Sequence, residues 1–208
     1  MKTFGILGDS YSTFQGYIPE GNRYYYPRPE AVEDVLRVEQ TWWHQLMKKR
    51  NLRLLINESY SGATVCEHNR EDLPEDSCYT KRAIQAFGPE NTEKCDIIFL
   101  FGCTNDSGEC REVGELQYEN WSAGDLRKVL PAYCYTIDVL KTYNPDATIV
   151  AIVNTSLNKE MRAGMIQAGE HYGIVNVVLQ NISKQNGHPT ALGMTQIAQQ
   201  VDAALDLI

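Results

Sequence analysis

Four residues in the chain carry groups suited to acyl transfer: Ser10, Gly62, Asn105 and His188. A serine hydroxyl becomes an effective nucleophile when a base such as histidine stands within hydrogen-bond reach. The oxyanion formed by its attack needs donors, which a glycine N–H and an asparagine amide can supply. Each residue alone is equally typical of a turn, a loop or the surface, so only their arrangement can indicate a site.

Ser10 follows an apolar run over residues 4–7 and the pair Gly8-Asp9. The run is typical of a buried strand, and the Gly-Asp-Ser sequence is typical of a sharp turn. Ligands of an open parallel sheet bind outside the carboxyl ends of its strands. We therefore expect Ser10 to lie where chemistry takes place, as a candidate nucleophile.

Strands and helices alternate along the chain. Apolar runs predict strands near 4–7, 52–57, 95–101, 147–153 and 174–179, and helical spacing predicts helices near 31–50, 79–87, 131–143, 158–172 and 190–207. Such alternation favours a parallel sheet with helices on both faces and right-handed connections. Gly62 and Asn105 then follow strands, and His188 precedes the last helix. Long irregular loops at 17–30, 63–78 and 107–124 are expected to shape the pocket.

Four short blocks contain these candidates in order: Gly-Asp-Ser-Tyr-Ser at 8–12, Asn-Glu-Ser-Tyr-Ser-Gly at 57–62, Gly-Cys-Thr-Asn-Asp at 102–106 and Gly-His-Pro at 187–189. Together they resemble the SGNH hydrolases, the GDSL-like lipase/acylhydrolase family. The resemblance implies a single domain over 1–208, a three-layer α/β/α sandwich with a flavodoxin-like parallel sheet of about five strands. It also implies that Ser10 is the nucleophile, His188 the general base, and Gly62 and Asn105 the oxyanion donors.

Two positions depart from the family pattern. Gln185 stands three residues before His188, where the family usually has an aspartate. A glutamine cannot supply the negative charge that stabilises an imidazolium, so the orienting group is either its carbonyl or a backbone carbonyl of the same loop. Cys103 stands where a second glycine is common, and we expect a small buried side chain there.

The leading hypothesis is a serine esterase that hydrolyses carboxylic esters through a Ser–His dyad, with acetyl esters of carbohydrates as one substrate class. The alternative is an SGNH-fold protein that binds a ligand but turns it over weakly or not at all. A nucleotide-binding protein is disfavoured, because no glycine-rich phosphate loop follows the first strand.

Composition narrows the partners. The formal net charge of −8 disfavours nucleic acid, and the apolar runs are too short to cross a membrane. The six cysteines lack the paired spacing of a zinc site, so we expect free thiols and neither a metal nor a cofactor. No export signal opens the sequence, which favours the cytoplasm unless a signal peptide precedes it. The oligomeric state is left open.

Overall fold

The computed structural model describes residues 1–30 and 32–207. Its centre is a five-stranded sheet with the order β2-β1-β3-β4-β5. The strands are β1 (Thr3–Gly8), β2 (Arg53–Ser59), β3 (Ile97–Phe101), β4 (Thr148–Val153) and β5 (Val175–Val178), and every neighbouring pair is parallel. This is the flavodoxin-like strand order, and it confirms the predicted fold class.

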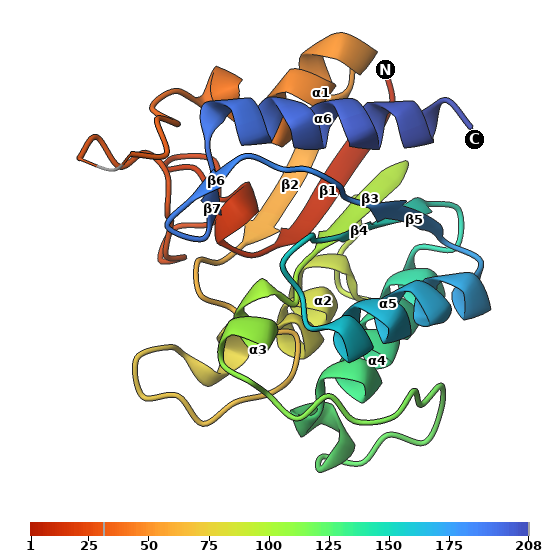
Figure 1. The fold of residues 1–208 in the computed structure, drawn as a ribbon. Helices are drawn as coiled ribbons and strands as arrows, with labels where there is room; N and C mark the ends of the chain where they lie inside the picture. Colours follow the sequence, from red (N-terminus) through yellow and green to blue (C-terminus); the bar gives the residue numbers. More distant parts are fainter. Residues whose placement is uncertain (31, 208) are drawn as a thin grey trace.

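Helices cover both faces of the sheet, as Figure 1 shows. One face carries α1 (Trp42–Arg50) and α6 (Ala191–Leu205); the other carries α2 (Tyr79–Phe87), α4 (Val129–Tyr143) and α5 (Lys159–Tyr172). Each face has its own apolar core. All five residues of β3 are buried, which explains why that strand is a continuous apolar run.

Two small elements lie beside the carboxyl edge of the sheet. The short helix α3 (Thr104–Gly108) follows β3, and a hairpin of two-residue strands, β6 (Lys184–Gln185) and β7 (His188–Pro189), precedes α6. The sequence predicted only loops here. The turn Asn186-Gly187 between the paired strands has positive φ at both residues, the conformation that a tight hairpin turn requires.

The helix predicted near 31–50 is wrong in its first half, and residue 31 lies outside the described part of the chain. The structure has turns before a 3₁₀ turn at Val38–Gln40, and α1 begins only at Trp42. Thr41 ends the irregular stretch because its hydroxyl accepts from the His44 N–H and caps the helix. Asp34 has a φ of 57°, which no α-helix accommodates.

Candidate active site

The turn after β1 places Ser10 at the carboxyl edge of the sheet. Asp9 caps a short 3₁₀ helix over Ser10–Ser12, since its carboxylate accepts from the Tyr11 N–H at 3.0 Å. The Ser10 side chain is almost fully buried, and its Oγ lies 3.0 Å from His188 Nε2. The structure therefore brings a hydroxyl and an imidazole that are 178 residues apart in sequence into hydrogen-bond contact.

The other ring nitrogen of His188 faces the backbone. Its Nδ1 lies 3.1 Å from the Asn186 carbonyl oxygen, an acceptor within the hairpin turn itself. An N–H at Nδ1 leaves Nε2 free to accept the Ser10 proton, which is the tautomer that a general base needs. The Gln185 side chain is exposed and makes no hydrogen bond to His188 in the described structure. Geometry thus favours the backbone carbonyl of the two orienters that the sequence left open.

The Tyr25 ring packs against one face of the His188 imidazole, a contact that the sequence did not predict. Its ring stacks on His188 at a centroid separation of 3.6 Å with only 7° between the planes. Its hydroxyl donates to Glu33 Oε1 at 2.9 Å, and Glu33 is 1% exposed. The sequence predicted that the 17–30 loop, which contains three consecutive tyrosines, would shape the pocket. It did not indicate which ring would contact His188.

Burial lowers the pKa of His188, because desolvation penalises the imidazolium more than the nearby charge of Glu33 favours it. The ring is therefore neutral, and able to act as a base, over more of the acidic range than an exposed histidine.

Gly62 follows β2 in a left-handed conformation with φ of +92°, which glycine adopts without strain. Its N–H has no protein acceptor among the described residues. A Cβ at this position would collide with the Arg23 guanidinium. Glycine is therefore required at position 62 both by the backbone conformation and by the close approach of Arg23.

Asn105 lies in α3, next to the loop that contains Gly62. One N–H of its amide is held by the Ala63 carbonyl at 2.7 Å, which leaves its second N–H for another acceptor. The neighbouring Asp106 carboxylate accepts from the N–H groups of Val65 and Cys66, so the loops after β2 and β3 are joined at three points. Cys103 is fully buried and has a φ of 67°, which explains why glycine is common at this position.

Two further ionisable groups lie near the site: Asp9 is fully buried, and Lys184 is half-buried. Burial raises the pKa of the Asp9 carboxyl to about 6. Lys184 donates to Asn154, Thr155 and Ser156 at 2.7 to 2.9 Å, and burial lowers its pKa to about 8. Sequence reasoning did not find Lys184, because a lysine in a polar loop ordinarily points into water.

The remaining histidines have other surroundings. His68 is buried against Ser77 and accepts from the Arg70 N–H. His171 stacks on Tyr118.

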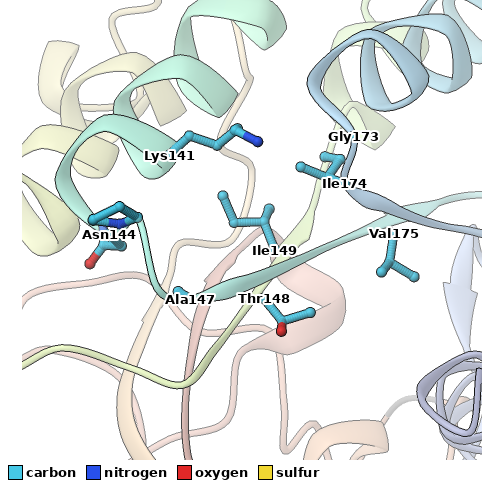
Figure 2. Close-up of a pocket in the computed structure, with 9 residues that line it drawn as sticks. Lys141, Asn144, Ala147, Thr148, Ile149, Gly173, Ile174 and Val175 are labelled. Carbon is cyan, nitrogen blue, oxygen red and sulfur yellow. The ribbon is translucent and has the colours of Figure 1, made fainter. Parts of the chain in front are cut away.

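Two cavities differ in their position relative to Ser10 and His188. The cavity in Figure 2, about 410 Å³, lies at the amino-terminal ends of β4 and β5, opposite the serine, and its Lys141 ammonium is held by the Tyr172 carbonyl. A groove of about 650 Å³ lies instead beside Tyr25 and Ser61, at the edge that carries Ser10 and His188.

The described part of the chain holds no group of three His, Cys, Asp or Glu side chains suited to a metal ion. Within it the six cysteines are free thiols. No helix among the described residues is long and apolar enough to span a bilayer.

A sandwich of this strand order with a serine and a histidine at its carboxyl edge has the fold of the SGNH-type hydrolases. The chain belongs to the GDSL-like lipase/acylhydrolase family, whose model matches residues 2–205. This confirms the family that the four sequence blocks predicted.

Solved structures agree with the family. A structure from Bacteroides uniformis described as a GDSL-like lipase is 39% identical, with 100% of this chain and 96% of that one covered at a TM-score of 0.91. A second, from Bacteroides ovatus, is 35% identical, covers 100% and 99%, and has a TM-score of 0.90. An acetyl xylan esterase from Butyrivibrio proteoclasticus is 16% identical, covers 99% and 63%, and shares the fold at a TM-score of 0.62. A comparison with curated proteins found no significant match.

Proposed function

We propose that this protein is a serine esterase that hydrolyses carboxylic esters, with Ser10 as nucleophile and His188 as general base. The observation that carries the proposal is the 3.0 Å contact between Ser10 Oγ and His188 Nε2, with the opposite ring nitrogen held by a backbone carbonyl. This geometry meets the requirement that an activated nucleophile has a base within reach and a third group that orients the base.

The reaction follows from these positions. His188 removes the Ser10 proton as Oγ attacks the ester carbonyl, and the resulting oxyanion accepts from the Gly62 N–H and the free N–H of Asn105. The imidazolium then gives its proton to the leaving alcohol, and the tetrahedral intermediate collapses to an acyl-serine. Water, deprotonated by His188, attacks the acyl group and releases a carboxylic acid and free Ser10.

Acetylated carbohydrates are the substrate class that we favour. Two solved proteins of the same fold are a carbohydrate esterase and an acetyl xylan esterase. The groove that contains Tyr25, the ring stacked on His188, is bordered by tyrosines, whose flat rings present both apolar faces and hydroxyls.

Replacement of the nucleophile tests the proposal. Ser10→Ala is expected to lower kcat for p-nitrophenyl acetate by at least ~10³-fold, because only binding and oxyanion stabilisation then contribute. A fluorophosphonate should label the wild type at Ser10 and leave the variant unlabelled by mass spectrometry. If a folded wild type shows no Ser10-dependent turnover and no label, the chain is instead a ligand-binding protein of this fold.

A further inference from the structure

Two arginine side chains line the groove beside Ser61. Its lining includes Arg23, Tyr24, Tyr25, Arg28, Glu30 and Ser61. Each guanidinium has one exposed carboxylate within 4 Å, Asp72 for Arg23 and Glu30 for Arg28, so the two arginines are distinguished by their position in the groove and not by an excess of charge. Its volume of about 650 Å³ falls within the roughly 300–1,000 Å³ typical of small-molecule sites.

Arg23 is fixed against the loop that presents Gly62. Its carbonyl accepts from the Ser61 N–H at 2.7 Å, and its Nε donates to the Ser61 carbonyl at 2.9 Å. The outer edge of the guanidinium lies over Gly62, at the point where a Cβ would otherwise stand. With Nε committed, the two terminal nitrogens remain as paired donors, the arrangement that binds a carboxylate bidentately.

Arg28 occupies the other side of the groove. Its guanidinium lies over the Tyr25 ring at 5.0 Å from the centroid, and Tyr25 in turn stacks on His188. The acidic neighbours of both arginines are exposed: Asp72 is 3.9 Å from Arg23, and Glu30 is 3.5 Å from Arg28. Water screens such pairs, so each guanidinium can still engage a bound anion.

From this arrangement we infer that the groove binds the alcohol part of the substrate and selects esters of a carboxylate-bearing sugar, a uronic acid. The parallel N–H donors of a guanidinium match the two oxygens of a planar carboxylate. Tyr24, whose ring is 43% exposed, offers a flat apolar face for the sugar ring. The inference rests on the proposed function, because it names the substrate class of the same serine.

The test compares two esters that differ only in charge. The substrates are an O-acetylated methyl glucuronoside and its uronamide, which is isosteric and neutral, with released acetate as the readout. The wild type should show a kcat/KM at least about tenfold higher for the acid at low salt. That ratio should fall when sodium chloride screens the arginines.

Arginine variants locate the effect. Arg23→Met and Arg28→Met should each bring the acid-to-amide ratio toward one. Arg53→Met removes the same charge from an exposed position at the start of β2, at the opposite edge of the sheet, and should retain the wild-type ratio. A wild-type ratio of one or less, or an equal loss on both substrates in the groove variants, would overturn the inference.

Equilibrium binding separates this inference from the esterase proposal. Calorimetry with Ser10→Ala should detect tighter binding of the acid than of the uronamide, without any turnover. If p-nitrophenyl acetate is hydrolysed through Ser10 while Ser10→Ala binds both sugars equally, the charge-selective groove is wrong and the esterase stands. If the acid binds selectively but no ester is turned over, the groove is supported and the esterase fails.

Discussion

At the scale of single residues, the histidine is oriented by neutral groups. A carboxylate partner would stabilise the imidazolium directly, whereas the Asn186 carbonyl at 3.1 Å contributes only a dipole. The Tyr25 ring packs against His188. The buried Glu33, which accepts from the Tyr25 hydroxyl, adds a more distant negative charge. The proposed base is thus held by packing as much as by hydrogen bonding.

Gln185→Ala is expected to lower kcat by less than ~10-fold, because the orienting carbonyl belongs to Asn186 and survives the substitution. Removal of a side chain that orients a catalytic histidine costs far more in known triads. The measurement is kcat for p-nitrophenyl acetate, with circular dichroism to verify folding. A loss as large as that of Ser10→Ala would make the glutamine side chain the third catalytic member.

Tyr25→Leu should lower kcat by about 10- to 100-fold, because a ring that is free to tilt loses its alignment with Ser10. It should also move the acid limb of the kcat/KM profile to higher pH. Burial lowers the pKa of His188, so exposing the ring to water raises that pKa and protonates the base earlier as pH falls.

Tyr25→Phe is the matched control for this stack. It keeps the ring against His188 but removes the hydroxyl that donates to Glu33. Its acid limb should stay close to that of the wild type. An unchanged profile in Tyr25→Leu would show that the stack does not set the environment of His188.

At the scale of elements, a side chain of α2 bridges the carboxyl ends of β1 and β2. Arg82, which is 2% exposed, donates to the carbonyls of Gly8, Glu58 and Ser77. Gly8 ends β1 just before Ser10, and Glu58 lies near the end of β2 just before the Gly62 loop. One buried guanidinium therefore fixes the spacing of the two loops that carry the proposed nucleophile and an oxyanion donor.

Arg82→Met is expected to lower the free energy of unfolding by on the order of 3 kcal/mol, because three carbonyls inside the protein each lose a hydrogen bond from a charged donor, although the Gly8 carbonyl keeps the Tyr60 N–H. Urea unfolding followed by fluorescence measures the change. Arg53→Met, at an exposed position of β2, should stay within about 0.5 kcal/mol of the wild type. Equal effects of the two substitutions would rule out the clamp.

Sequence patterns predicted the elements whose burial follows a regular period. The helix at 79–87 was predicted with the bounds that α2 has, since its apolar side chains face one core. The first half of the helix predicted near 31–50 is wrong because Val32, Val35 and Leu36 have helical spacing, yet only Val35 is buried; the second half is α1. The stack on His188 could not be predicted, because it depends on how the 17–30 loop packs against a residue that is distant in sequence.

At the scale of the whole molecule, several buried ionisable side chains lie at the carboxyl edge of the sheet. Asp9 and Asp106 are fully buried, and one Asp9 oxygen has no partner among the described residues. Arg82 and Lys184 stabilise the charged form of Asp9, but burial destabilises that form more. The pKa of Asp9 therefore rises to about 6. Enclosing these groups costs stability at the edge where the chemistry is proposed.

Asp9→Asn should become increasingly stabilising, relative to the wild type, as the pH rises from about 4 to about 7. An unfolded chain releases the Asp9 proton near ~3.9, whereas the folded protein holds it up to about pH 6. Between these values the folded state binds more protons, so the stability of the wild type falls with rising pH by up to about 3 kcal/mol on account of this group. Asparagine has no proton to lose, and its amide oxygen can still accept from the Tyr11 N–H.

The quantity to measure is the difference in unfolding free energy between Asp9→Asn and the wild type, by urea titration at several pH values. Any fixed cost of placing an amide at this position is the same at every pH and cancels from the trend. The titrations of groups that do not interact with Asp9 also cancel, because both proteins share them. A difference that does not change with pH would mean that Asp9 is already ionised in the folded protein, held as a carboxylate by Arg82 and Lys184 against the cost of burial.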